Sequence, residues 1–229
     1  MNFGDDIMSE NKNIQKVNNQ STGEEIGNSI SHGIGALLSI AGTVVAIVYA
    51  ALHGDARSIV SACLYGAGLI ILYTASTLYH SLTNYKAKRV FQVLDHCSIY
   101  ILILSSYIPI SLSLIRGTLG WIIFGFNAAC TAIGVTLTAI NMKKFHPIAM
   151  VLYVLMGWSI IFFGIPTLKT IPLPGIWLLV SGGLCYTGGI VFFALKKPRY
   201  MHMIWHFFVL AGSILQYFAF LFYTLPYPV

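Results

Sequence analysis

The sequence carries few charged residues. Only 9% of its 229 residues are Asp, Glu, Lys or Arg, whereas 57% are hydrophobic. Soluble domains carry roughly 25% charged residues, so this chain has too little charge to cover a surface that faces water. The scarcity of charge therefore excludes an ordinary soluble domain and makes lipid the solvent of most of the surface.

Three sequence patterns are also missing, and each absence excludes a class of protein. The four cysteines, Cys63, Cys97, Cys130 and Cys185, form no CxxC pair. We therefore expect neither a cysteine metal site nor a disulfide framework. No basic stretch is interleaved with aromatic residues, so we expect no nucleic-acid partner, and nothing in the sequence names a protein partner. No secretory signal precedes the first apolar run, which is expected to stay as a membrane helix.

Seven apolar runs are each long enough to cross the hydrocarbon core, which takes about 20 helical residues. The runs are continuously apolar and do not alternate as barrel strands do, so they favour helices. The predicted fold is an all-α integral membrane bundle of seven transmembrane helices. The approximate ranges of the helices are 29–52, 58–82, 90–114, 118–140, 147–168, 173–195 and 202–225.

The basic residues are distributed unevenly between the two sets of connections. Residues 1–23 are polar and are predicted to form a disordered tail, before a single membrane domain over residues 24–229. Ten of the 13 Lys and Arg residues lie in this tail and in the second, fourth and sixth connections, and three lie in the others. Basic residues collect on the cytoplasmic side. We therefore expect a multi-pass protein of the cell (plasma) membrane with its amino terminus in the cytoplasm and its carboxyl terminus outside.

Polar residues inside apolar spans are costly and are therefore candidates for function. The predicted topology brings several of them to one depth, near the cytoplasmic ends of the first, second, third and seventh spans. They are Glu25, Asn28, His32, Ser76, His80, Asp95, His96, His202 and His206. His202 and His206 are four residues apart, so they share a helix face about 6 Å apart along the axis. Such a pair is typical of a transition-metal half-site, although two histidines bonded to backbone or lipid headgroups would have the same spacing.

The types of side chain favour zinc over calcium or magnesium, which prefer oxygen ligands. Iron, manganese and nickel stay open as alternatives. Asp95 begins the third span only 15 residues after His80, and a carboxylate in an apolar span needs a partner such as a dication. Three protein ligands would leave a fourth position for water, whose pKa zinc lowers to about 7, and Asp95 could act on that water as a base or orient it.

Four stretches resemble motifs of the hemolysin III family, the bacterial branch of the progestin and adiponectin receptor (PAQR) family within the CREST-type membrane hydrolases. They are residues 25–35, 76–80, 94–100 and 202–209, in the family order. The resemblance implies the same seven-helix topology and a zinc ion bound by His80, His202 and His206. It also implies that Asp95 engages the zinc-bound water with Ser76 nearby. Related alkaline ceramidases hydrolyse a lipid amide bond with a similar constellation.

The first functional hypothesis is a zinc-dependent hydrolase of a lipid amide or ester bond, with membrane lipid as environment and substrate. In it His80, His202 and His206 bind zinc, Asp95 is the general base, and Ser76 supports the oxyanion or the water. A receptor-like or sensor protein with a structural zinc is the alternative, and a membrane-lytic or pore-forming protein is the second alternative.

Four further residues are candidates for positioning roles around the metal. They are His32, His96, Glu25 and Asn28. The two histidines could orient a ligand through a hydrogen bond or simply join helices, and Glu25 could cap the first helix.

Overall fold

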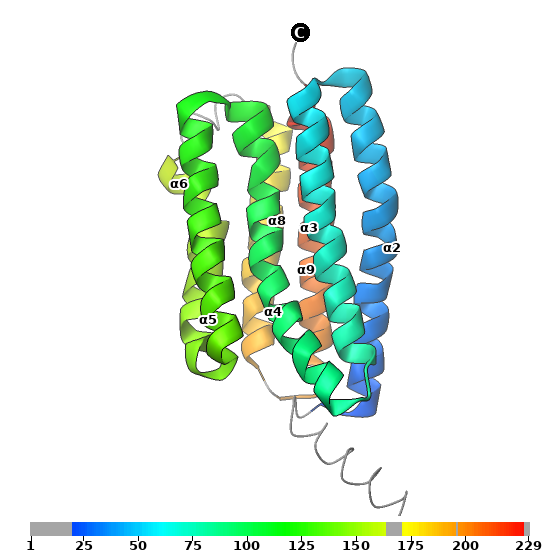
Figure 1. The fold of residues 1–229 in the computed structure, drawn as a ribbon. Coiled ribbons are helices and arrows are strands. Elements are labelled where there is room, and N and C mark those ends of the chain that lie inside the picture. Colours follow the sequence, from blue (N-terminus) through cyan, green and yellow to red (C-terminus); the bar gives the residue numbers. More distant parts are fainter. Residues whose placement is uncertain (1–19, 164–170, 196, 227–229) are drawn as a thin grey trace, which may run out of the picture.

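The structure is a computed structural model that describes residues 20–163, 171–195 and 197–226. Within these residues every regular element is a helix, and the long helices run side by side (Figure 1). The elements are α2 (Thr22–His53), α3 (Ala56–Ser81), α4 (Tyr85–Ile108), η1 (Pro109–Ile115), α5 (Gly117–Gly157), α6 (Ser159–Phe163), α8 (Leu173–Ala194) and α9 (Met201–Tyr223). Of the predicted disordered tail, residues 1–19 lie outside the described ranges, whereas residues 22 and 23 already belong to α2.

Six helices in the described ranges are long and apolar enough to cross a membrane, when the π-helical turn η1 is joined to α4. The predicted all-helical membrane fold is confirmed to this extent. Two helices begin earlier than their apolar runs, because polar residues cap them. Ser21 and Glu24 form a capping box at the start of α2, and the Asn84 side chain accepts a hydrogen bond from the backbone N–H of Ala87 at the start of α4.

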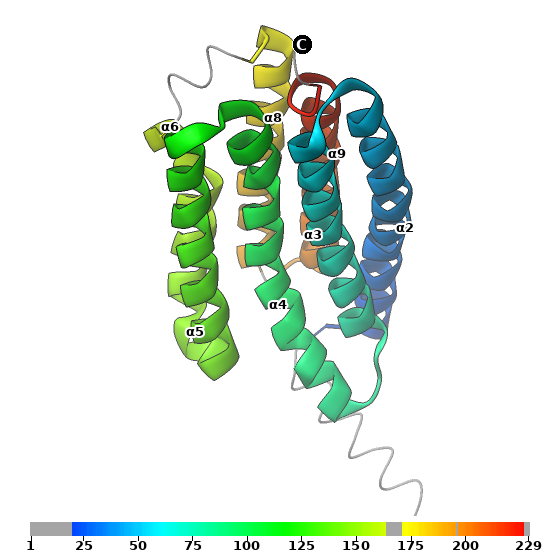
Figure 2. The ribbon, with the colours of Figure 1, turned by 45° about the horizontal axis from the view of Figure 1, so that its top comes forward.

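Helix α5 is interrupted at one residue. Asn141 has non-helical dihedral angles, with φ −159° and ψ 88°, and the chain turns back so that two limbs lie side by side (Figures 1 and 2). The Asn141 side chain accepts a hydrogen bond of 3.0 Å from the backbone N–H of Lys144, which caps the second limb. The break falls between the predicted runs 118–140 and 147–168. The end of the second run, residues 164–168, lies outside the described residues.

The largest apolar core cluster joins α3, α4, η1 and α9. It comprises Tyr65, Leu69, Leu72, Tyr73, Leu102, Ile110, Trp205, Val209 and Phe220. Helices α8 and α9 approach closely at Gly182 and Gly212, where a Cβ on either would lie 3.1 Å from the carbonyl oxygen of the other. Small residues allow such contacts, and packing of this kind holds membrane helices together.

The two ends of the bundle carry different polar groups. The His80 end contains the end of α3 and the starts of α2, α4 and α9. The Arg116 end contains the opposite ends of these helices, with Asp55 before α3 and Arg116 after η1. The candidate site lies at the His80 end.

Candidate metal centre

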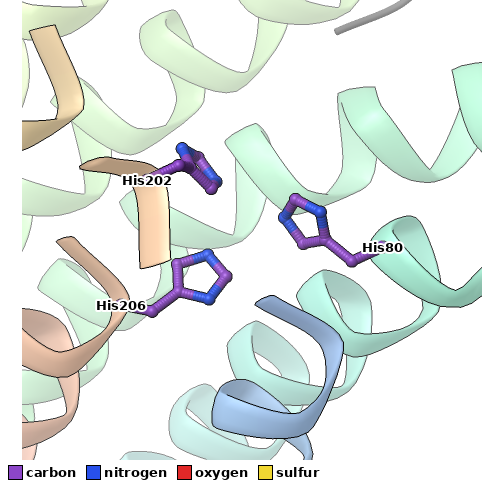
Figure 3. A group of neighbouring side chains, drawn as sticks. All are labelled: His80, His202 and His206. Atoms are coloured by element: carbon purple, nitrogen blue, oxygen red, sulfur yellow. The ribbon is translucent and has the colours of Figure 1, made fainter. Parts of the chain in front are cut away.

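Three histidines meet at the His80 end. His80 comes from the last turn of α3, and His202 and His206 come from the first turns of α9 (Figure 3). The ring centroids are 5.2 Å apart for His80 and His202, 5.2 Å for His80 and His206, and 4.8 Å for His202 and His206. One ring nitrogen from each lies within 4.8 Å of the other two. The three imidazoles therefore surround one small space.

The three histidines form a triangle, and their ring nitrogens are suited to a metal. The Nε2 atoms of His80, His202 and His206 are buried and have no hydrogen-bond partner. A buried polar atom without a partner is costly, so three such atoms around one space fit a group that can accept their lone pairs. Neutral imidazole nitrogen is a common ligand of zinc and other transition metals. The three residues predicted as metal ligands fit a metal ion both in position and in chemistry.

His80 is held by a chain of charged groups from two other helices. Its Nδ1 lies 2.7 Å from Oε2 of Glu25 on α2, and Oε1 of Glu25 lies 3.1 Å from Nζ of Lys88 on α4. Lys88 is 1% exposed and also donates a hydrogen bond of 2.9 Å to the carbonyl oxygen of Tyr79. With Nδ1–H donated to the carboxylate, the lone pair of Nε2 is left for a metal.

His206 is oriented by the same face of α2. Its Nδ1 lies 3.0 Å from Oγ of Ser31 and 3.2 Å from the carbonyl oxygen of Asn28. The Ser31 hydroxyl donates to that carbonyl, so its oxygen is free to accept from Nδ1–H. Asn28 thus contributes its backbone, while its side-chain Nδ2 donates to Gln20. Helix α2 supplies no metal ligand but fixes the ring orientation of two of the three.

The start of α9 is also tied to α2. Oε1 of Glu24 accepts a hydrogen bond of 2.9 Å from the backbone N–H of Tyr200, whose φ of 67° lies in the left-handed region. The other carboxylate oxygen of Glu24 accepts from the backbone N–H of Ser21 at 2.8 Å. Glu25 also lies in the first turn of α2, as its predicted capping role requires, but the capping box uses Glu24 while the Glu25 carboxylate bonds His80.

Asp95 and Ser76 lie beside the triangle without joining it. Asp95 is 3% exposed, its Oδ2 lies 3.7 Å from Nδ1 of His96, and its carboxyl group is close enough to His80 to interact electrostatically. The fully buried Ser76 hydroxyl interacts with the Asp95 carboxyl group without a well-formed hydrogen bond. Among the described residues, the group that could hold a metal consists of the three histidines and does not include Asp95.

The two other candidate histidines have different surroundings. His32 is 1% exposed and stacks on His206 with ring centroids 3.5 Å apart and planes 9° apart, and neither of its ring nitrogens makes a well-formed hydrogen bond. His96 bonds the carbonyl oxygen of Gln92 on its own helix at 2.9 Å. His32 thus belongs to the centre by contact, whereas His96 neither orients a metal ligand nor joins two helices through this bond.

Comparison with known proteins identifies the family. A family model described as "Haemolysin-III related" matches residues 20–217, which is most of the chain. The chain belongs to the haemolysin-III-related family. The triangle of His80, His202 and His206 lies within the matched residues.

Relatives of this haemolysin-III-related protein occur in bacteria and animals. "Hemolysin-3" of Bacillus cereus is 39% identical over 203 residues, which cover 89% of this chain and 93% of the relative. "Hemolysin-3 homolog" of Bacillus subtilis (strain 168) is 38% identical over 90% of this chain and 96% of the relative. "Monocyte to macrophage differentiation factor" of Homo sapiens is 27% identical over 86% of this chain and 82% of the relative. The family and the apolar helices make this a multi-pass membrane protein.

A large apolar cavity of the haemolysin-III-related protein begins one helical turn from the metal centre. Its volume is about 370 Å³, and it lies between α4, α5, α8 and α9, with Leu72 of α3 in its wall. Leu72, Ile99 and Val209 line it, and they lie three or four residues from Ser76, Asp95 and His206 on the same helices. Because residues at this spacing are neighbours on a helix face, the wall of the cavity begins about one helical turn from Ser76, Asp95 and His206.

Two residues of the centre were missed by sequence reasoning. Lys88 was counted only as one of the basic residues of the second connection, but it is buried in α4 and paired with Glu25. Ser31 lies in the stretch 25–35 but was not singled out as a candidate. Its spacing of three residues from Asn28 is the signal that could have placed it next to Asn28 on the helix surface.

Proposed function

We propose that this protein is a zinc-dependent hydrolase that cleaves an amide or ester bond of a membrane lipid. The observation that carries the proposal is the set of three unpartnered Nε2 atoms that face one space beside a large apolar cavity. His80, His202 and His206 would hold the zinc ion. Zinc bound there would supply a Lewis acid and would lower the pKa of a coordinated water to about 7.

In this proposal the two polar groups beside the histidines, Asp95 and Ser76, have separate roles. Asp95 takes a proton from the attacking water at its carboxylate, while the water oxygen bonds to the carbonyl carbon of the lipid. The Ser76 hydroxyl donates a hydrogen bond to the carbonyl oxygen as negative charge develops there. The proton held by Asp95 then passes to the leaving amine or alcohol as its bond to the carbonyl carbon breaks. Both side chains are buried, so bulk water does not compete for these contacts.

The cavity supports a lipid substrate. Its volume lies in the range of small-molecule pockets, about 300–1,000 Å³, and most of its wall is aliphatic or aromatic. An acyl chain in this cavity would bring the linkage at its end to the level of Ser76 and Asp95. The apolar wall stabilises the chain, and the polar groups at the His80 end act on the linkage.

We also propose seven spans with the amino terminus in the cytoplasm. Helix α5 has 41 residues, and a straight helix of that length would measure about 60 Å, twice the hydrocarbon thickness of about 30 Å. The break at Asn141 divides it into two limbs, each counted as one span. Lys88 is paired inside the bundle, yet nine basic residues still lie on the proposed cytoplasmic side against three on the other. A cytoplasm-only reporter that is active when fused after Val229 would contradict this orientation.

The test of the catalytic proposal combines metal analysis with lipid cleavage. Purified protein should contain about one zinc per chain and should release fatty acid from a ceramide or a lysophospholipid, as measured by mass spectrometry. Chelation should abolish the release and added zinc should restore it. Asp95→Asn should keep the zinc and lower the rate by about 10²–10⁴-fold, because it loses the base. A zinc-loaded wild type that cleaves no lipid in a broad panel would overturn the hydrolase proposal.

The same preparations separate the alternatives. Zinc that raises the melting temperature without any turnover favours a structural zinc in a receptor-like or sensor protein. The bacterial relatives bear the name Hemolysin-3, so release of dye from liposomes should be measured as well. Dye release that persists in the His202→Ala, His206→Ala double variant would support a lytic function independent of the metal.

A further inference from the structure

The wall of the cavity contains one side-chain amide, that of Gln216. Every hydroxyl group of the wall makes a hydrogen bond within the protein, as does the Trp158 indole. These bonds include Tyr107 to the Gly157 carbonyl at 2.8 Å, Tyr153 to the His96 carbonyl at 3.0 Å, Trp158 to Thr187 at 3.0 Å, and Tyr186 with Ser213 at 2.8 Å. By contrast, Oε1 of Gln216 is buried and lacks a partner.

Gln216 lies on the same helix as two histidines of the metal centre, at a distance that the helix geometry fixes. Gln216 and His206 both lie on α9, ten residues apart, which corresponds to about 15 Å along the helix axis. Its Cγ packs against the Gly182 backbone of α8, where a Cβ would lie 2.8 Å away. The close contact with α8 fixes the side chain, so a ligand can meet the amide only at this distance from the metal centre.

We propose that Gln216 is a specificity-determining residue that selects an acyl chain with a hydroxyl group about 15 Å from the cleaved linkage. A buried amide favours a ligand that completes its hydrogen bonds and disfavours an all-methylene chain that leaves it unpaired. A hydroxyl group suits either orientation of the amide because it donates and accepts. This inference rests on the proposed function, in which the cavity holds the acyl chain and the linkage lies at the His80 end.

Binding of three free fatty acids to the purified full chain tests the inference. The probes are stearic acid, 12-hydroxystearic acid and 2-hydroxystearic acid. The hydroxyl of the second lies eleven bonds from its carboxyl carbon, about 13 Å at the roughly 1.2 Å per bond of an extended chain. Wild type should bind 12-hydroxystearic acid about fivefold more tightly than the other two, the effect of one net hydrogen bond.

Two variants separate a specific contact from a packing effect. Gln216→Leu removes the amide and should reverse the preference, so that stearic acid binds more tightly than 12-hydroxystearic acid. Ser106→Ala is the matched control, because Ser106 lines the same cavity but bonds the Ile103 carbonyl on its own helix. This control should keep the wild-type preference.

The outcomes distinguish this inference from the proposal on which it rests. Equal binding of the three acids by wild type, or an unchanged preference in Gln216→Leu, overturns the role of Gln216 alone. If none of the acids binds while the zinc is present, the cavity is not an acyl-chain site. That result would remove both this inference and the substrate class of the proposed hydrolase.

Discussion

The His80 and Arg116 ends of the bundle both bury polar groups, but they leave different atoms available. At the Arg116 end the polar groups bond one another. Asp55 accepts from Arg116 Nη2 at 2.7 Å and from the backbone N–H of Ser58 at 3.0 Å. The Ser58 hydroxyl lies 2.9 Å from Ser113, whose hydroxyl donates to the Thr224 carbonyl oxygen. These bonds tie helix ends together.

At the His80 end the hydrogen bonds have another result. Glu25 and the Asn28–Ser31 segment each engage one ring nitrogen of a histidine, and the opposite nitrogen is left without a partner. A network that satisfies its own members stabilises a fold, whereas one that leaves matched acceptors around a space prepares a binding site. The contrast predicts that substitutions at the two ends affect different properties.

The largest expected effect is the loss of metal at the His80 end. The His202→Ala, His206→Ala double variant removes two of three ligands, so its bound zinc should fall from about one per chain to none. Inductively coupled plasma mass spectrometry after gel filtration measures this. Asp55→Asn at the opposite end is the control and should retain full zinc. Zinc retained by the double variant would contradict the assignment of the centre.

The next effect concerns the residues that orient His80. Lys88→Met removes the cationic partner of Glu25, so the carboxylate holds the imidazole less firmly, and zinc affinity should fall about tenfold or more. Competition with a chromogenic chelator measures the affinity. Lys86→Met is the matched control, because Lys86 is an exposed lysine two residues away on α4. The Glu25→Gln, Lys88→Met double variant avoids a buried unpaired charge and allows the measurement if Lys88→Met alone folds poorly. Equal zinc affinities of Lys86→Met and Lys88→Met would contradict the role of Lys88 in orienting His80.

A smaller effect is expected on stability at the Arg116 end. Arg116→Met breaks the ion pair with Asp55 and removes the hydrogen bond that Arg116 Nε donates to the Ser113 carbonyl oxygen. The side chains of Arg116 and Asp55 are 21% and 38% exposed, so solvent screens the pair. The free energy of unfolding should therefore fall by about 0.7–2.5 kcal/mol for both contacts together. Unfolding in mixed micelles measures the change, and the zinc content should be unaltered. A loss of zinc in this variant would mean that the two ends are coupled.

The smallest expected effect is the pH dependence of the stabilisation that Asp55 contributes at the Arg116 end. Slight burial raises the pKa of Asp55, but hydrogen bonds from Ser58 and Arg116 outweigh it and hold the pKa below its ordinary value. The stabilisation is therefore complete above the unfolded-state pKa of about 3.9 and is lost as pH falls further, through the folded-state pKa. Wild type should lose its stability advantage over Asp55→Asn in that acidic range. A constant difference between pH 3 and 7 would contradict the pKa direction.

Most of the fold was predictable because membrane helices follow from run length and charge. Six of the predicted runs match described helices or limbs of α5 apart from their polar first turns. The run 147–168 is matched only in part, because α5 ends at Gly157 and the short α6 covers Ser159–Phe163. The polar first turns were missed because Ser21 and Asn84 cap helices outside the apolar runs. The depth of a residue in a span follows from its sequence position, so His80, His202 and His206 were correctly grouped.

Depth did not predict which direction a side chain faces around its helix. His96 shares the depth of Asp95, yet its Nδ1 bonds its own helix. Lys88 lies among connection residues in the sequence, and only the packing of α4 against α2 and α3 shows that it is buried beside Glu25. Partners that come from three different helices depend on helix rotation, which a single sequence does not fix.

The origin of the three histidines has a consequence for biosynthesis. His80 ends the second described helix, whereas His202 and His206 begin the last one, so more than half of the chain is translated between them. The centre cannot assemble until α9 has inserted and packed against α3. Binding of a metal at this centre would therefore report that α9 has been inserted, and a nascent chain that stalls before α9 would hold only one of the three proposed ligands.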